Sequence, residues 1–273
     1  MNRQAWDISI EHLCGGYDGR LVLQDFSATL PAGTVTTILG ESGCGKTTLL
    51  RLLLGLNRPV SGRILIGGRD VSAMSEAQFR KMRRRFGVLF QDGALISSLT
   101  LAENVALPLV EHTGLPRKTL RDAALRTLEL VGLDNFADYY PGELSGGMRK
   151  RAGLARAIVT EPPVLFCDEP TSGLDPITAA QMDQLLLDMK ACYPDMTTVV
   201  VTHDLGSVEH IAEHVLVLRA GKAVFAGSRK ELSTASDPYL NRFLHRKFEE
   251  SRRMAAPPLD SAVRGALAEW LDD

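Results

Sequence analysis

The stretch GESGCGKTT, Gly40 to Thr48, satisfies the phosphate-loop pattern G-x-x-x-x-G-K-[ST] and decides how the neighbouring sequence is interpreted. The apolar segment TVTTIL precedes it and the helical pattern LLRLLLGL follows it, so the order is strand, glycine loop, helix. Glycines let the loop backbone turn its amide hydrogens toward one point, and the helix start adds about half a positive charge from its dipole. The stretch therefore predicts a phosphate site rather than an ordinary glycine-rich turn.

Two side chains of this loop carry further chemistry. Lys46 is expected to reach the β- and γ-phosphates of a nucleotide, and the Thr47 hydroxyl is expected to complete the coordination of Mg²⁺. The loop residues expected to contact the nucleotide are Gly40, Glu41, Ser42, Gly43, Cys44, Gly45, Lys46, Thr47 and Thr48.

A pair of acids follows the apolar segment PVLFC. Asp168 is the carboxylate expected to help hold Mg²⁺, and Glu169 comes directly after it. Because side chains alternate along a strand, the two acids cannot share one role, but at the strand's end Glu169 can turn toward an attacking water. Glu169 is therefore the candidate general base. The alternative is a pair of solvated turn acids.

The rest of the sequence alternates between strand and helix patterns. Residues 7 to 39 hold short β-branched segments separated by turn residues, and residues 100 to 160 show helical periodicity. Strand and helix patterns then alternate again, and TTVVV reads as a buried parallel strand. The pattern predicts an α/β fold with a helical lobe inserted between two core strands.

Composition limits the classes of protein to consider. The chain has 273 residues, 45% of them hydrophobic and 23% charged, which is typical of a globular protein. A formal net charge of -2 gives no global reason to expect nucleic acid as a partner. No apolar run approaches the roughly 18 residues that a spanning helix needs. The four cysteines lack zinc-site spacing, so we expect reduced thiols.

Several motifs occur in the order found in ATP-binding cassette ATPases, which the sequence resembles over about residues 7–235. They are GESGCGKTT, the pair Phe90-Gln91, LSGGM at 144–148, LFCDEP at 165–170, SGLD at 172–175 and His203. The resemblance implies a P-loop NTPase (RecA-like) core with a mainly parallel sheet and an N-terminal antiparallel β subdomain. It also implies a helical subdomain at about 92–160, a C-terminal helical extension at 236–273, and ATP with Mg²⁺ as the ligands.

The resemblance assigns roles to further residues. Tyr17 is expected to stack on adenine, with an ordinary hairpin aromatic as the alternative. Gln91 is expected to contact Mg²⁺ and the attacking water, and Asp175 to lie at an interface between two subunits. His203 is expected to contact the γ-phosphate, since it follows the strand TTVVV beside the phosphate loop. Glu169, His203, Gln91 and Lys46 form the expected catalytic set.

The segment LSGG completes the expected site in an unusual way. In cassette ATPases the equivalents of Ser145, Gly146 and Gly147 begin a helix whose amides face the γ-phosphate bound to the other subunit. The chain carries one copy of each half-site, so the resemblance implies a two-fold homodimer with ATP between the subunits.

Residues 90–116, FQDGALISSLTLAENVALPLVEHTGLP, together with Met148, resemble the Mla (maintenance of lipid asymmetry) ATPases that serve Mce-type lipid transport. This resemblance implies phospholipid transport by a peripheral subunit on the cytoplasmic face of a bacterial inner membrane. Its expected partners are a permease dimer, a Mce-domain lipid-binding protein and a small STAS-domain subunit, with no nucleic acid. Residues 92–112 are the expected permease contact, with ordinary helical-lobe core as the alternative.

Two further segments suggest contacts outside the nucleotide site. The basic run Lys81 to Arg85 suggests either a solvated helix face or a contact with anionic lipid head groups. The C-terminal segment places apolar residues at helical spacing, and so short a helix is expected to dock on another surface. These residues are Leu259, Val263, Ala266, Leu267, Trp270 and Leu271.

Other functions share the same catalytic motifs. The ATPase of an amino-acid, metal or lipoprotein transporter is the first alternative, and a non-transport cassette protein is the second. A nucleotide-binding scaffold without turnover is the third, although Glu169 and His203 together argue against it.

Overall fold

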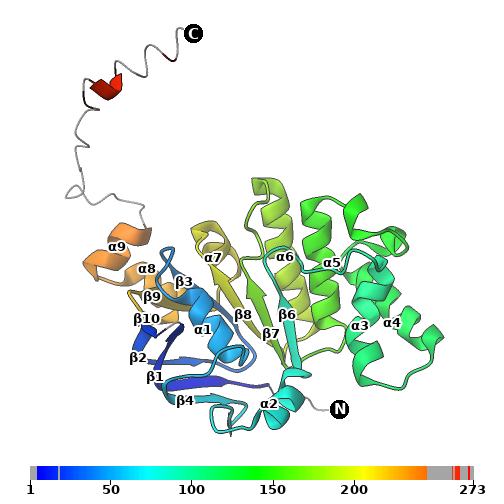
Figure 1. The fold of residues 1–273 in the computed structure, drawn as a ribbon, viewed down its shortest axis with the longest axis horizontal. Coiled ribbons are helices and arrows are strands. Elements are labelled where there is room, and N and C mark those ends of the chain that lie inside the picture. Colours follow the sequence, from blue (N-terminus) through cyan, green and yellow to red (C-terminus); the bar gives the residue numbers. More distant parts are fainter. Residues whose placement is uncertain (1–4, 18, 245–259, 261, 265–269, 271–273) are drawn as a thin grey trace. The chain divides into compact units, whose positions relative to one another are not determined.

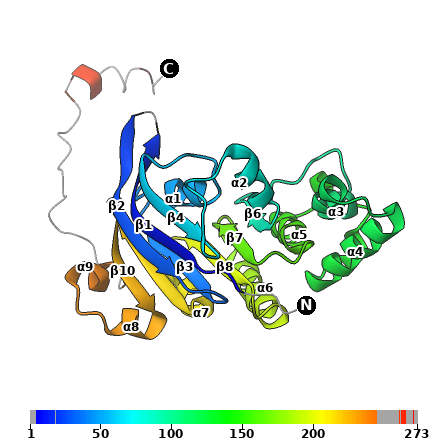
Figure 2. The ribbon, with the colours of Figure 1, turned by 90° about the horizontal axis from the view of Figure 1, so that it is seen from below.

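The computed structural model of the chain describes residues 5–17, 19–244, 260, 262–264 and 270. The chain divides into two compact units, of which the first ends at Thr234 and the second begins at Ala235. The first unit contains two sheets and the helices that cover them, as Figures 1 and 2 show. The second contains α9 (Pro238–Leu244).

The larger sheet contains the buried strands that the sequence predicts. Its strand order is β10-β9-β3-β8-β7-β6, in which β10 is antiparallel to β9 and the other neighbours are parallel. The strands are β3 (Val35–Gly40), β6 (Phe86–Leu89), β7 (Val164–Asp168), β8 (Thr197–Thr202), β9 (His214–Arg219) and β10 (Lys222–Ser228). Every residue of β3 and β8 is buried, as expected for parallel strands covered on both faces.

The smaller sheet is antiparallel and faces α1 (Lys46–Leu53). Its strand order is β2-β1-β4-β5. The strands are β1 (Ile8–Tyr17), β2 (Arg20–Leu30), β4 (Ser61–Ile66) and β5 (Arg69–Asp70). One hydrophobic cluster joins Phe26 of β2, Leu49 of α1 and Phe166 of β7, and each of these side chains is fully buried. Burial of these apolar side chains holds α1 between the two sheets, and Figure 2 shows this arrangement.

The opposite face of the larger sheet packs on a second hydrophobic cluster. Leu165 of β7 and Val200 of β8 point into it, together with Leu186 of α6 and Leu154 of α5. Besides α1, the α-helices of the first unit are α2 (Glu76–Arg83), α3 (Leu101–His112), α4 (Arg117–Leu130), α5 (Gly146–Ile158), α6 (Pro176–Cys192), α7 (Leu205–Ile211) and α8 (Arg229–Thr234). Helices α3, α4 and α5 pack together beside β6 in Figure 1.

These elements confirm the predicted fold class: a mainly parallel sheet, an antiparallel β sheet in the N-terminal part, and helices between β6 and β7. The proposed limits of a helical subdomain at 92–160 and an extension at 236–273 stay predictions. Within the described residues, no helix is both long enough and apolar enough to cross a membrane. Of the predicted C-terminal apolar face, Val263 and Trp270 are described and exposed. Leu259, Ala266, Leu267 and Leu271 lie outside the described residues.

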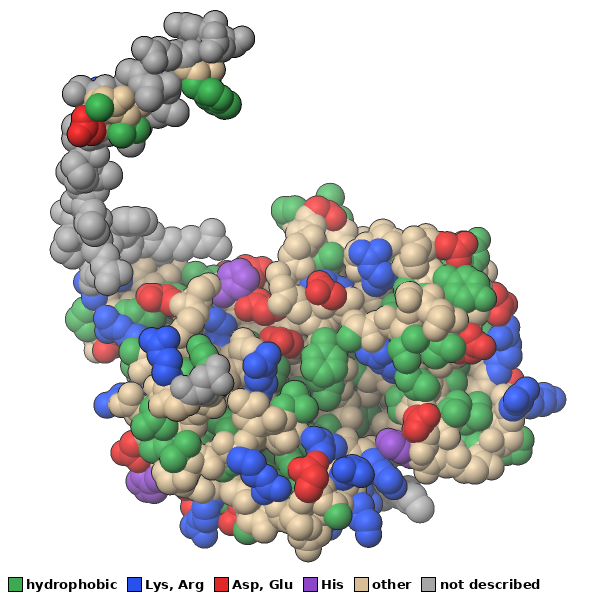
Figure 3. Space-filling model, in the orientation of Figure 1, with side chains coloured by type: hydrophobic (Ala, Val, Ile, Leu, Met, Phe, Trp, Pro, Cys, Tyr) green, Lys and Arg blue, Asp and Glu red, His purple; other side chains and the backbone are tan. Residues whose placement is uncertain are grey.

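The basic run of α2 is partly engaged within the first unit. Arg83 forms an ion pair with Glu76 of the same helix, and the Arg85 guanidinium lies 5.8 Å from the centroid of the Trp6 ring. Figure 3 shows Lys and Arg side chains gathered along the lower edge of this face, where Figure 1 places α2. A contact of these side chains with lipid head groups stays a prediction.

A buried asparagine holds the segment that leads into α3. Asn104 is fully buried, and its Oδ1 accepts a hydrogen bond from the Ile96 amide at 2.7 Å. Its Nδ2 lies 3.0 Å from the carbonyl oxygens of Ile96, Leu99 and Thr100. Thr100 caps α3 through a reciprocal pair of bonds with Glu103. Residues 96–100 belong to no helix or strand, so their backbone groups lack regular hydrogen bonds. The side chains of Asn104 and Glu103 supply partners for several of these groups.

We expect Asn104→Ala to lower the free energy of unfolding by about 2 to 4 kcal/mol, because a fully buried side chain is truncated and partly buried backbone groups lose their partner. Urea unfolding followed by circular dichroism measures this change. The matched control is Asn135→Ala, since Asn135 is exposed and its truncation is expected to be close to neutral. Equal midpoints for the two variants would contradict the role of Asn104.

Candidate functional site

The predicted site residues follow the carboxyl ends of strands that are neighbours in the larger sheet. The phosphate loop follows β3, His203 follows β8, Asp168 ends β7 with Glu169 next to it, and Gln91 comes two residues after β6. Because β3, β8, β7 and β6 are parallel and adjacent in that order, their carboxyl ends lie along one edge of the sheet. Residues distant in the sequence are thereby brought to one place.

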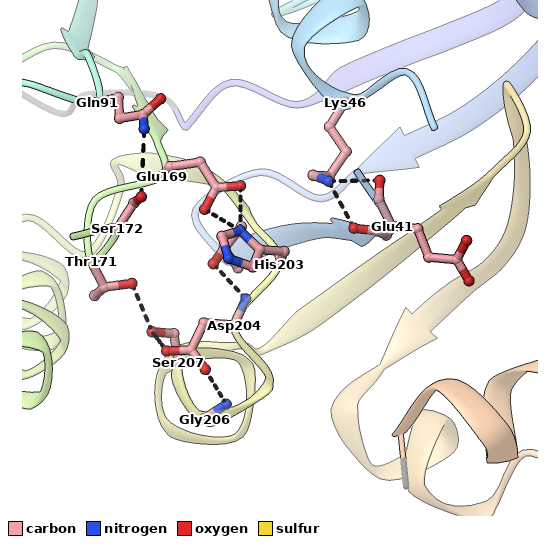
Figure 4. A network of polar contacts seen from close by, with 12 residues as sticks. Glu41, Lys46, Gln91, Glu169, Thr171, Ser172, His203, Asp204, Gly206 and Ser207 are labelled. Atoms are coloured by element: carbon pink, nitrogen blue, oxygen red, sulfur yellow. Dashed lines mark hydrogen bonds and ion pairs between the residues drawn. The ribbon is translucent and has the colours of Figure 1, made fainter. Parts of the chain in front are cut away.

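The phosphate loop has the geometry of an anion site. Nζ of the buried Lys46 donates hydrogen bonds to the carbonyl oxygens of Gly40 at 2.7 Å and Glu41 at 3.1 Å, as Figure 4 shows. Gly45 has a φ of 116°, and a Cβ there would come within 2.9 Å of a Leu23 methyl carbon. No side chain caps α1 and its first turn has no acid, so the first amides of this helix remain available to a ligand.

An open pocket of about 320 Å³ adjoins this loop, within the size range of small-molecule sites. Its lining residues are Tyr17, Val22, Gly43, Gly45, Lys46, Thr47, Thr48, Arg51 and Asn57. Tyr17 ends β1 and is 52% exposed, so one face of its ring is free to stack on a planar group. The pocket therefore combines phosphate-binding groups with an aromatic platform.

Glu169 and His203 are joined by a hydrogen bond at the sheet edge. Nδ1 of His203 lies 2.9 Å from Oε1 and 2.9 Å from Oε2 of Glu169, which is the cluster at the centre of Figure 4. The Glu169 backbone has a φ of 47°, a left-handed conformation that is uncommon for residues other than glycine. This conformation turns the side chain out of the strand register and toward β8.

Asp168 lies at the end of β7, in a partly buried position. Burial raises the pKa of its carboxyl, and so does the negative charge of Glu169, while Arg51 and Lys46 oppose both effects. The oxygen donors of Thr47, Gln91 and Asp168 are of the kind that Mg²⁺ prefers. Gln91 donates through Nε2 to Ser172 Oγ at 3.5 Å, so its amide oxygen is not used by this bond. The residues present fit a magnesium ion bound together with a nucleotide phosphate.

Three polar residues that the sequence did not single out belong to this region. Arg51 and Asn57 line the pocket, and Lys150 contacts the turn that carries Glu169. Arg51 follows Thr47 by one helical turn, a spacing that places both on one face of α1. Asn57 and Lys150 have no comparable signal, because one lies in a loop and the other belongs to a run of basic residues.

The residues of LSGG do not line the pocket beside the phosphate loop. They begin α5, where the Ser145 hydroxyl caps the helix by accepting from the Met148 amide at 3.2 Å. A Cβ on Gly147 would lie 2.6 Å from a Thr178 methyl carbon, so α5 requires a glycine there to approach α6. Ser145 and Gly146 are exposed, and a second amide-rich helix start therefore faces outward.

Asp175 and Met148, which the sequence singled out, both make contacts within their own chain. Asp175 caps α6 and accepts from the Thr178 hydroxyl and from the amides of Ile177 and Thr178. These bonds lower the pKa of Asp175, with the Thr178 hydroxyl the largest cause. Met148 packs against the hydrophobic cluster of the helices. An interface role for Asp175 stays a prediction.

Residues 92–112 divide between the two alternatives that the sequence left open. Leu101, Ala102, Val105 and Ala106 of α3 are buried, and they belong to the core of the helices. Ile96 and Val110 are 42% and 50% exposed. A contact with another protein can therefore involve only the exposed residues of the segment.

A family model described as "ABC transporter" matches residues 23–172. The chain is 43% identical over 225 residues to the "Intermembrane phospholipid transport system ATP-binding protein MlaF" of Escherichia coli, which covers 82% of this chain and 83% of that protein. It is 42% identical over 238 residues to the "Probable ribonucleotide transport ATP-binding protein mkl" of Mycobacterium tuberculosis, covering 87% of this chain. The match spans 66% of the length of that mycobacterial protein. Over 246 residues it is 42% identical to the "Methionine import ATP-binding protein MetN" of Cereibacter sphaeroides, covering 87% of this chain and 69% of that protein.

Solved structures with a similar fold include a dimeric ATP-binding cassette in a post-hydrolysis state bound to ADP and Pi. It has 30% identity and a TM-score of 0.73, and the match covers 81% of this chain and 98% of that one. The cbiO1 subunit of a Clostridium perfringens ABC transporter complex has 29% identity and a TM-score of 0.78. The match covers 97% of this chain and 100% of that one.

The raised pKa of Asp168 predicts a pH-dependent effect of its removal. A carboxyl whose pKa is raised by folding destabilises the folded state once it is ionised, and this cost disappears below its unfolded value, near 3.8. We expect Asp168→Asn to raise the thermal midpoint of the nucleotide-free protein at pH 7. The gain should shrink as the pH falls through the raised pKa of Asp168 toward 3.8.

Differential scanning calorimetry of both proteins between pH 4 and pH 7 tests this prediction. Asp122→Asn is the control, because Asp122 is an exposed residue of α4. A gain from Asp168→Asn that does not depend on pH would contradict the account.

Proposed function

The chain belongs to the ABC transporter family, and from this premise we propose that it is the ATP-hydrolysing subunit of a bacterial ABC transporter that powers phospholipid transport. The observation that carries the enzymatic part is the paired Glu169 and His203 on the sheet edge that also carries the phosphate loop. The cargo rests on the likeness to the phospholipid transport protein of Escherichia coli.

In this proposal the pocket beside the phosphate loop binds ATP. Tyr17 stacks on the adenine ring, and Lys46 exchanges its bonds to the loop carbonyls for bonds to the β- and γ-phosphates. The remaining loop residues from Gly40 to Thr48 surround the phosphates with backbone amides and hydroxyls. Mg²⁺, held by Thr47, Gln91 and Asp168, neutralises phosphate charge when it is bound.

Glu169 acts as the general base for the water that attacks the γ-phosphorus. The carboxylate takes a proton from that water as the new P–O bond forms and the bond to the ADP oxygen breaks. His203, held by the Glu169 carboxylate, contacts the γ-phosphate, and Gln91 orients the water. The left-handed backbone of Glu169 supports this role, because it aims the carboxylate away from the strand.

A second copy of the chain completes the nucleotide site. Ser145, Gly146 and Gly147 lie apart from the pocket lining of their own chain, and their outward-facing helix start can bind the γ-phosphate held by another copy. Two-fold pairing would make two identical sites, with Asp175 at the interface. ATP binding then closes the dimer, and hydrolysis opens it.

The transporter context includes partners outside this chain. The proposed contact with a permease dimer uses exposed residues of the segment 92–112, which include Ile96 and Val110. The chain would act as a peripheral subunit at the cytoplasmic face of the inner membrane. A Mce-domain lipid-binding protein and a small STAS-domain subunit would complete the complex.

A second candidate cargo comes from the relatives. The methionine import protein MetN is 42% identical to this chain, so import of an amino acid is the alternative function. Affinity purification of the full chain from membranes, followed by identification of the proteins and lipids that accompany it, separates the two. A Mce-domain protein with bound phospholipid supports the proposed cargo, and a solute-binding protein for an amino acid contradicts it.

We expect Glu169→Gln to lower the rate of ATP hydrolysis by about 10² to 10⁴, because the amide cannot accept the proton of the attacking water. ATP should remain bound and unhydrolysed, so the variant should accumulate an ATP-bound dimer in size-exclusion chromatography. Glu129→Gln, a change at an exposed residue of α4, is the matched control. Equal ATP turnover by Glu169→Gln and the unaltered chain would contradict the enzymatic proposal.

A further inference from the structure

Lys150 of α5 is buried, although it belongs to the basic run RKR that follows LSGGM. Only 4% of its surface is exposed, whereas a lysine is ordinarily at the surface. A buried ammonium group is costly unless its hydrogens are bonded. The partners of Lys150 therefore indicate why the chain keeps a charge there.

Those partners are backbone carbonyls of the turn that carries the catalytic acid. Lys150 Nζ donates to the carbonyl oxygen of Ser172 at 2.5 Å and to that of Glu169 at 3.3 Å. The turn is also closed by a bond from the Ser172 amide to the Glu169 carbonyl at 3.1 Å. One ammonium group thus holds both ends of the four-residue turn from Glu169 to Ser172.

The same group lies near the charges of a third segment. Burial lowers the pKa of Lys150, while the carboxylates of Asp92 and Glu169 raise it. Asp92 follows Gln91, whose side chain bonds to Ser172 Oγ, as Figure 4 shows. Lys150 therefore lies where α5, the Glu169 turn and the segment after β6 meet.

The position of Lys150 along α5 places it between the LSGG helix start and the turn that carries Glu169. The helix begins at Gly146 with Ser145 as its cap, so Lys150 lies about one helical turn after the residues proposed to face the ATP of another copy. A shift of α5 along its axis would move Lys150 and the turn bonded to it together. Helix α5 and Lys150 are therefore enough to connect the LSGG helix start to the turn that carries Glu169 in the same chain.

We propose that Lys150 is a positioning residue that links the LSGG helix start of each chain to that chain's own Glu169. Contact of Ser145, Gly146 and Gly147 with the partner's nucleotide is thereby transmitted through α5 to the backbone of the catalytic turn. This inference rests on the proposed ATPase function. Lys150 acts through the backbone of the turn, because both of its bonds go to carbonyl oxygens there.

The test is the steady-state ATPase activity of the full chain with Lys150 changed to Met, Gln or Arg. Lys150→Met keeps the length of the apolar stem and removes the donors. We expect its kcat to fall by about 10- to 100-fold, the size of effect that misplacing a catalytic group produces. KM for ATP should stay within about twofold, since the binding pocket is unchanged. Lys150→Arg should recover part of kcat, because it restores a charged donor.

Lys118→Met, at an exposed lysine of α4, is the matched control and should retain the kcat of the unaltered chain. A folded Lys150→Met protein with unchanged kcat overturns the inference, and so does a loss confined to KM. If Lys150→Met fails to fold, Lys150→Gln is judged by the same criteria. An unaltered chain without ATP turnover overturns the proposed function, and the Lys150 inference with it. Turnover by the unaltered chain with an equal kcat for Lys150→Met overturns the inference alone.

Discussion

The parallel pairing of β3, β8, β7 and β6 is the constraint on which the site depends. Each strand ends beside its neighbour, so the loops that follow them share one edge of the sheet. Strand pairing therefore sets the relative positions of the phosphate loop, His203, Glu169 and Gln91. The two hydrophobic clusters on either face of the sheet hold these strands in register.

This arrangement separates two helix starts that have the same chemistry. The start of α1 opens into a pocket of its own chain, whereas the start of α5 lies outside that pocket. Each of these helix starts is able to bind a phosphate. Pairing of two copies would let the α5 start of one chain bind the phosphate held at the α1 start of the other, which explains why one chain has both. The buried Lys150 gives a physical route between them, because it bonds α5 to the turn after β7.

Much of the fold could be predicted from the sequence because its signals are local. Buried strands appear as runs of Val and Ile, helices as periodic patterns, and the phosphate loop as a motif between a strand and a helix. That Glu169 turns toward an attacking water stays a prediction; its left-handed backbone lies directly after the last residue of β7. The segment 92–112 fits both interpretations, because α3 is buried on one side and exposed on the other.

The residues that could not be predicted depend on contacts between distant segments. The burial of Lys150 results from the packing of α5 against the turn after β7, and nothing in the run RKR distinguishes it from its neighbours. The bonds of Asn104 depend on how residues 96–100 fold back over α3. Asn57 lines the pocket from the loop after α1, and neither a motif nor a spacing distinguishes it. Sequence spacing predicts the residues of the motifs, but it does not predict these supporting contacts.

The central claim, that each nucleotide site is made by two chains, is tested most directly by complementation. Lys46→Ala removes the phosphate-loop lysine, and Ser145→Arg blocks the helix start of α5. Both changes are placed in chains that also carry Glu169→Gln, and the ATP retained after rapid gel filtration is measured for each variant and for their mixture. The account predicts that neither variant alone retains ATP, while the mixture retains one ATP for each mixed pair, because each mixed pair contains one intact composite site. A mixture that retains no more ATP than the separate variants would contradict a site shared between two chains.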